Sequence, residues 1–162
     1  MPNSTPLTLG DVVMPNRISV RSLFIKANGP TITKGLIYTA DANGRLIVPV
    51  AASSIADLTG GVFQAMETPA NATTVEDTDS VQVLQPQSRI LLKAQSTLSV
   101  GDEVELYCSG ATTPVQDTCV AATQPKTKGY LGRITQIYTQ SGGVDKKVTA
   151  TNDLVVVDLG AA

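Results

Sequence analysis

The stretch Thr31-Ile-Thr-Lys-Gly35-Leu-Ile-Tyr38-Thr-Ala-Asp-Ala-Asn43-Gly44-Arg-Leu46-Ile-Val-Pro-Val50 indicates how this chain folds. It reads as a glycine turn, an apolar strand, a second glycine turn and a return strand. The run from Asp41 to Gly44 tolerates positive φ, so residues 36–40 and 45–50 are expected to pair as a hairpin. Pro49 has no backbone donor, which places the end of the return strand at an edge or a bulge.

A second stretch restates the same phrase: Thr97-Leu-Ser-Val-Gly101-Asp-Glu-Val104-Glu-Leu106-Tyr-Cys108-Ser-Gly110. We interpret the two as an internal pseudo-repeat, with two similar lobes closing one barrel. The alternative is coincidence, because Gly-turn-strand phrases are common in all-β proteins. Alternation in the second copy predicts that Val104, Leu106 and Cys108 face the core while the two glutamates face water.

The rest of the chain supports an all-β fold, either a compact β-barrel or a β-sandwich of short antiparallel strands. We expect one domain over residues 18–162, preceded by an extended arm over residues 1–17. Residues 51–58 are the one stretch that favours a helical turn, with Ser53 or Ser54 as its cap. Further strands are expected at residues 18–26, 62–66, 81–84, 89–93, 103–108, 118–122, 129–139 and 153–159.

The composition predicts an aliphatic core, since 42% of the 162 residues are hydrophobic, 4% are aromatic and Trp is absent. We place Phe24, Phe63 and Met66 in or beside that core; surface exposure of any of them would mark a partner patch. The run Leu154-Val-Val-Val157 is expected to be buried on both faces.

Charge and hydropathy argue against two classes of partner. The net charge is −2 and no segment gathers the basic residues that neutralise phosphates, so no nucleic-acid partner is expected. No apolar run approaches the roughly 20 residues that span a bilayer, and no export signal is evident, so no membrane partner is expected. Lys126, Lys128 and Arg133 form a small basic patch, which we interpret as a solvated turn face.

The sequence is poor in residues for catalysis. Without histidine, Ser-His-Asp and Cys-His arrangements are excluded. We expect no enzyme activity, catalytic residue, cofactor or metal site. The one candidate catalytic cluster is Glu76, Asp77 and Asp79, for which a solvated acidic turn is the favoured interpretation.

The two cysteines, Cys108 and Cys119, flank a polar loop. If the loop closes a hairpin, they lie close enough for a disulfide. Two reduced, inward-facing thiols are the equally weighted alternative.

Four stretches within residues 29–138 resemble the small cement, or decoration, proteins of tailed-bacteriophage capsids. They are Lys34-Gly-Leu-Ile-Tyr-Thr-Ala-Asp-Ala-Asn-Gly44, Gly61-Val-Phe-Gln-Ala65, Leu98-Ser-Val-Gly-Asp-Glu-Val104 and Gly129-Tyr-Leu-Gly-Arg-Ile134. The resemblance implies a virion structural protein, made in the host cytoplasm, that binds the capsid exterior and bridges subunits of the major capsid protein, often as a homotrimer.

The arm is the predicted partner contact, because apolar residues recur in its proline-broken sequence. Its alternative is to pack on its own domain. The residues assigned to a capsid or neighbouring-subunit contact are Pro2, Asn3, Pro6, Leu7, Leu9, Val12, Val13 and Met14.

Other functions stay open from the sequence. A free-standing β-sandwich of the carbohydrate-binding or adhesion type is the first alternative, although only Tyr38, Tyr107, Tyr130 and Tyr138 offer a phenol ring for a sugar. A tail or head-fibre base component is another virion role that the sequence does not separate from decoration.

Overall fold

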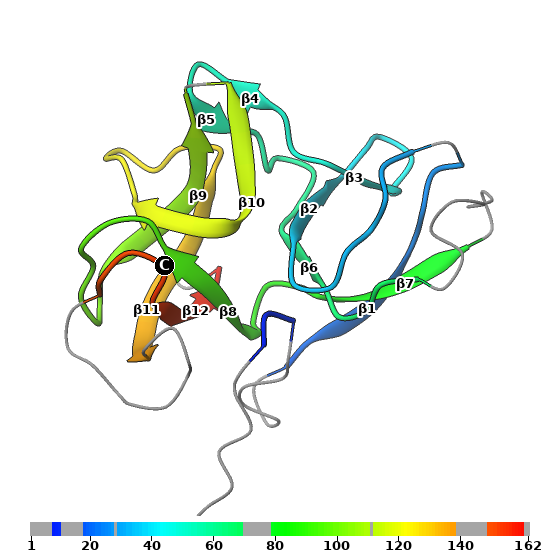
Figure 1. Ribbon diagram of the computed structural model, residues 1–162. Coiled ribbons are helices and arrows are strands. Elements are labelled where there is room, and N and C mark those ends of the chain that lie inside the picture. Colours follow the sequence, from blue (N-terminus) through cyan, green and yellow to red (C-terminus); the bar gives the residue numbers. More distant parts are fainter. Residues whose placement is uncertain are drawn as a thin grey trace, which may run out of the picture.

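The computed structural model describes residues 8–10, 18–27, 29–69, 79–110, 112–138 and 149–160. Two curled five-stranded sheets, which we call the first and second lobes, lie side by side (Figure 1). The elements of the described residues are all strands, which confirms the all-β prediction. No helix in this part of the chain has the length and hydropathy needed to cross a membrane.

The first lobe is an antiparallel sheet with the strand order β1-β7-β6-β2-β3. The predicted hairpin is present, and Ala40 pairs with Leu46 across it. Because the sheet curls, a parallel bridge between Ile25 and Leu46 brings its two outer strands together. Its strands are β1 (Val20–Phe24), β2 (Ile37–Ala40), β3 (Leu46–Ile47), β6 (Phe63–Ala65) and β7 (Ser80–Leu84). Its core is the cluster of Leu23, Ile25, Ile32, Tyr38, Leu46, Phe63, Ala65, Val81 and Val83.

The second lobe is a closed barrel with the order β10-β8-β12-β11-β9. It closes where β10 and β8 run parallel, with Cys119 paired to Ala94. The run 154–157 is buried on both faces as predicted, with exposures of 5% for Leu154 and 0% for the three valines. The strands are β8 (Arg89–Ala94), β9 (Glu103–Ser109), β10 (Thr113–Ala121), β11 (Tyr130–Tyr138) and β12 (Leu154–Leu159).

The two lobes share one topology. Strands β1, β2, β3, β6 and β7 of the first lobe occupy the places of β8, β9, β10, β11 and β12 in the second, and both lobes close between their first and third strands. The pseudo-repeat prediction is therefore confirmed at the level of strand order. The expectation that both copies close one barrel is corrected, because each copy lies in its own sheet.

Hydrogen bonds match between the lobes residue by residue. Gly35 N donates to Ala65 O at 2.9 Å, and its counterpart Gly101 N donates to Ile134 O at 2.8 Å. Both glycines adopt positive φ, at 90° and 96°, which L side chains rarely adopt. The same turn therefore starts the second strand of each lobe.

A second matched pair of hydrogen bonds fixes the register of β1 against β7 and of β8 against β12. Ile25 N donates to Asp79 O at 2.9 Å, and Ala94 N donates to Asp153 O at the same distance. Ile25 and Ala94 are also the residues at which the two lobes close. Counting back from them, Ser22 of β1 is the counterpart of Leu91 of β8.

The predicted helical turn at residues 51–58 is wrong. This stretch forms a hairpin between β4 (Ala51–Ala52) and β5 (Ile55–Ala56), whose tight turn has Ser53 and Ser54 at φ 53° and 71°. Tertiary contacts override the local preference: Ala56 is fully buried in the core of the second lobe, and Leu58 N donates to Lys128 O.

Candidate functional site

One row of side chains shows how the lobes differ in surface chemistry. In the first lobe, four adjacent strands place Ile37, Gln64, Leu84 and Val20 side by side in register. The equivalent row of the second lobe reads Glu103, Arg133, Asp158 and Arg89. The first row is apolar apart from Gln64, whereas every member of the second is charged.

The apolar row joins the two lobes. Ile37 and Leu84 are fully buried in the cluster that forms the core of the second lobe. Gln64 is fully buried between the lobes, and its Nε2 donates to Leu91 O at 2.8 Å and to Gly35 O at 3.1 Å. The charged row is instead held by two ion pairs, Arg133 to Glu103 at 3.2 Å and Arg89 to Asp158 at 3.8 Å.

Beyond the contact between the two lobes, which we call the junction, the outer face of β1 is exposed and largely apolar. We call Val20, Ser22 and Phe24 the β1 row, because they alternate along one face of the strand. Phe24 is 55% exposed and Val20 41%, and Ile18, just before the strand, is 40% exposed. The prediction that Phe24 lies in or beside the core is therefore wrong, while Phe63 is buried and Met66 packs against the core as predicted.

The arm is anchored at its middle. Leu9 packs against Leu91, Leu154 and Val156 on the outside of the second lobe, as the alternative interpretation of the arm expected. The contact is tight, because a Cβ on Gly35 would lie 2.5 Å from the Leu9 Cβ. The other predicted arm contacts lie outside the described residues: Pro2, Asn3, Pro6, Leu7, Val12, Val13 and Met14.

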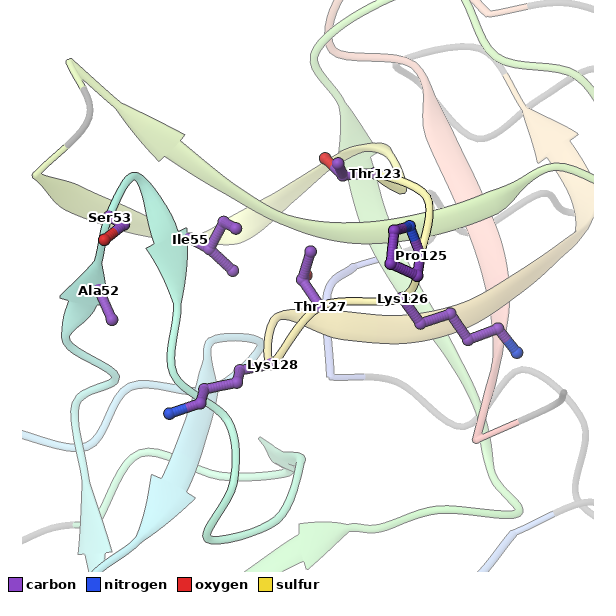
Figure 2. A pocket seen from close by; sticks show the side chains of 8 residues that line it. All are labelled: Ala52, Ser53, Ile55, Thr123, Pro125, Lys126, Thr127 and Lys128. Atoms are coloured by element: carbon purple, nitrogen blue, oxygen red, sulfur yellow. The ribbon is translucent and has the colours of Figure 1, made fainter.

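A pocket of about 540 Å³ lies between the β4–β5 hairpin and the loop that joins β10 to β11. Figure 2 shows Ile55 and Thr127 facing one another across it, with the ammonium groups of Lys126 and Lys128 directed away from each other. Both lysines have acidic partners: Lys126 pairs with Glu103 at 3.4 Å and Lys128 with Asp57 at 4.0 Å. Each lysine of the basic patch seen in the sequence therefore has an acidic partner in the fold.

Two glutamates of β9 hold the pocket loop. Glu105 is 8% exposed, so the prediction that it faces water is wrong. Its carboxylate accepts hydrogen bonds from the Thr123 amide, the Thr123 hydroxyl and the Thr127 hydroxyl. These donors replace water around the buried carboxylate and fix the loop to the barrel.

The second glutamate, Glu103, lies at the rim of this loop. Partial desolvation acts to raise its pKa. Hydrogen bonds from Gln124 and Lys126, together with the charges of Lys126 and Arg133, outweigh that effect and hold the pKa below its ordinary value.

Both cysteines are free thiols in the structure. The β9–β10 register pairs Cys108 with Pro114 and Cys119 with Leu106, so the two are not cross-strand neighbours. Burial raises the pKa of Cys119 to about 12 and also raises that of Cys108. Neither thiol is activated as a nucleophile at neutral pH.

The remaining sequence candidates divide between described and masked positions. Asp79 contributes a backbone carbonyl that accepts from Ile25 N where β1 pairs with β7, while Glu76 and Asp77 lie outside the described residues. Tyr38 is 1% exposed, so its ring is not available to a sugar. Within the described ranges, no group of three His, Cys, Asp or Glu side chains gathers as a metal site.

The β1 row is the surface that sequence reasoning missed. Phe24 sits in an apolar run that reads as a core strand, and only the register shows which residues point outward. The signal was the alternation Ile18, Val20, Ser22, Phe24 beside Leu23 and Ile25, which marks two faces. No protein-family model and no curated protein matches this sequence.

Proposed function

We propose that this chain is a virion structural protein that binds the outer surface of an assembled phage capsid and stabilises it by bridging major capsid protein subunits. The resemblance of its glycine-spaced phrases to capsid decoration proteins supports this assignment. It also supports a homotrimer as the bound form.

The observation that carries the proposal is the exposed β1 row. Large apolar side chains that gather on one face of a strand mark an interaction surface more often than scattered ones do. Here Phe24 and Val20 are about half exposed in a sheet whose other apolar residues are buried or, at Ala40 and Ile47, partly buried. Val20 also pairs with Leu84, so the β1 row continues the row of Ile37, Gln64 and Leu84. In that row Ile37 and Leu84 are buried against the second lobe.

Binding of this kind stabilises a shell by mass action. A protein that binds the assembled shell and not the dissociated subunits adds its binding free energy to the assembled state. On a symmetric lattice, several copies or several contacts per copy reinforce one another through effective concentration. The mechanism needs a rigid scaffold with a docking face, and two matched lobes held by a buried junction provide one.

The test is co-sedimentation of the purified protein with expanded empty shells assembled from the major capsid protein of the same phage. Phe24→Ser should lower the affinity about 10–100-fold, because burying a Phe side chain contributes about 1.5–3 kcal/mol. Val100→Ser is the matched control, since Val100 is 52% exposed but lies at the turn before Gly101 in the second lobe. Wild-type binding by Phe24→Ser, or no binding by the wild type, would contradict the proposal.

A further inference from the structure

In the pseudo-repeat, β1 of the first lobe corresponds to β8 of the second lobe, and the outer face of β8 is covered. Ser22 of β1 is the counterpart of Leu91 of β8, as the matched closures at Ile25 and Ala94 establish. The strands beside them also match, because β7 places Gln82 opposite Ser22 and β12 places Val156 opposite Leu91. The two sites therefore have the same backbone framework.

In the second lobe, other residues of the same chain cover the site at Leu91. Leu9 packs on the outward side chains of Leu91 and Val156. The backbone carbonyl of Leu91 accepts a hydrogen bond from the Gln64 side chain at 2.8 Å. Coverage of the first strand thus has two components, an aliphatic side chain on the face and a polar donor on the backbone edge.

In the first lobe neither component is found among the described residues. Val20 and Phe24 are exposed, and Ser22 between them is exposed as well. The bonds from Ile25 N to Asp79 O and from Gln85 N to Ser19 O show that odd-numbered residues bond to β7. In an antiparallel ladder the backbone groups of the alternate residues, Val20 and Ser22, then point to the opposite edge.

That edge is where the first lobe is least closed. β1 is an end strand in the order β1-β7-β6-β2-β3, and β3 is only two residues long. The lobe closes at the single bridge from Ile25 to Leu46, beyond the far end of β1. The edge at Val20 and Ser22 therefore presents a donor and acceptor pair per residue next to an apolar face.

We propose that this edge of β1 receives an extended segment of a major capsid protein subunit as an added strand. The inference rests on the proposed function and names the chemistry of its partner. The segment carries aliphatic side chains at alternate positions, which pack on Val20 and Phe24 as Leu9 packs on Leu91. The exposed cation Arg21, between Val20 and Ser22 on the other face of the strand, favours an acidic side chain at an intervening position of the segment.

The first test is amide hydrogen exchange, with the free protein compared with protein bound to the expanded shells. The amides of Val20 and Ser22 should exchange at least tenfold more slowly on the shell, because they gain hydrogen-bond partners. The amides of Arg21 and Leu23, which point to β7, serve as the internal control. Unchanged rates at Val20 and Ser22 in shell-bound protein would overturn strand addition while leaving capsid binding intact.

Two other outcomes would also overturn the proposal. Slow exchange of Val20 and Ser22 in concentrated protein without shells would show that the occupant is this chain, as a second copy or as its own arm. Failure to co-sediment with shells at all would remove the proposed function together with its partner.

A pair of variants at Ser22 tests the same edge. Both remove the Ser22 hydroxyl group, and only one of them removes the backbone N–H. Ser22→Pro removes the edge donor, and an edge position tolerates proline because its amide does not point to β7. Ser22→Ala keeps the donor. We expect Ser22→Pro to lose at least tenfold in shell affinity and Ser22→Ala to bind as the wild type; equal binding by both would contradict strand addition. Should Ser22→Pro fail to fold, the exchange rates of the wild type decide.

Discussion

The two lobes of this protein have the same strand order and opposite surface chemistry. At equivalent positions across four strands the first lobe has Ile37, Gln64, Leu84 and Val20, where the second has two ion pairs between strands. Topology alone therefore does not decide which sheet is covered by protein. The side chains in this one row do.

The charged row also explains why the second lobe offers no second junction. Acidic and basic side chains across a sheet face oppose further packing, because burying them removes their hydration. The apolar row of the first lobe, in contrast, packs against the second lobe. Among the exposed large apolar side chains of the described residues are Val20 and Phe24 of β1, a strand at the end of the first-lobe sheet (Figure 1).

Replacing an apolar residue of the first-lobe row by its charged counterpart should have the largest effect on stability. Leu84→Asp gives the first lobe the carboxylate of its counterpart Asp158, but at a position that is 0% exposed and packed against the second lobe. We expect a loss of about 3–5 kcal/mol in the free energy of unfolding, because the charge is buried without a partner. Urea denaturation followed by circular dichroism measures it.

The reverse exchange is its matched control. Asp158→Leu takes the carboxylate away from the buried Arg89 Nε and should cost less than Leu84→Asp, about 1–2 kcal/mol. Losses of similar size in the two variants would show that the rows do not differ in burial as described.

The equivalent glycines test the anchor of the arm. Alanine at Gly35 or Gly101 strains a backbone at positive φ by about 1–2 kcal/mol. At Gly101 the new methyl group meets nothing within 4 Å, whereas at Gly35 it would lie 2.5 Å from Leu9. We therefore expect a loss of about 2–4 kcal/mol for Gly35→Ala and only the strain for Gly101→Ala. Denaturant titrations give both values.

Limited proteolysis measures whether Leu9 is released from the second lobe. Gly35→Ala should speed cleavage of the arm after Leu9 by chymotrypsin in limited proteolysis, and Gly101→Ala should leave the rate unchanged. Equal stability losses and equal cleavage rates would show that Leu9 does not hold the arm.

The smallest effect concerns pH. The pKa of Glu103 is lowered in the fold, so its contribution to stability is present above its ordinary value of 4.5 and is lost as the pH falls through the folded value. Its counterpart Ile37 does not titrate. Between pH 6 and pH 3 the urea midpoint of the wild type should fall more steeply than that of Glu103→Gln. Parallel pH profiles would refute the role of this carboxylate; Asp57, whose pKa is also lowered by the hydroxyl of Thr59, leaves a residual slope in both.

Local turn chemistry made much of the fold predictable. Asp41 to Gly44 gave the β2–β3 hairpin, and the two glycine phrases predicted the matched lobes. The sequence did not show that each phrase closes its own sheet, because strand partners far apart in the chain are set by packing and not by local preference.

Long-range contacts also explain the wrong predictions. Residues 51–58 favour a helix locally, yet burial of Ala56 against the barrel makes them a hairpin. Glu105 is buried because Thr123 and Thr127, from another part of the chain, supply donors. Phe24 is exposed because its register with Ser80 places it on the outer face of an end strand.

The most direct test of the docking face is a cryo-electron microscopy reconstruction of expanded shells saturated with the protein. We predict that β1 of the first lobe contacts the shell, with density for a capsid strand beside Val20 and Ser22, and that the row of Glu103, Arg133, Asp158 and Arg89 faces solvent. A reconstruction in which the charged row contacts the shell and Phe24 remains in solvent would contradict the account.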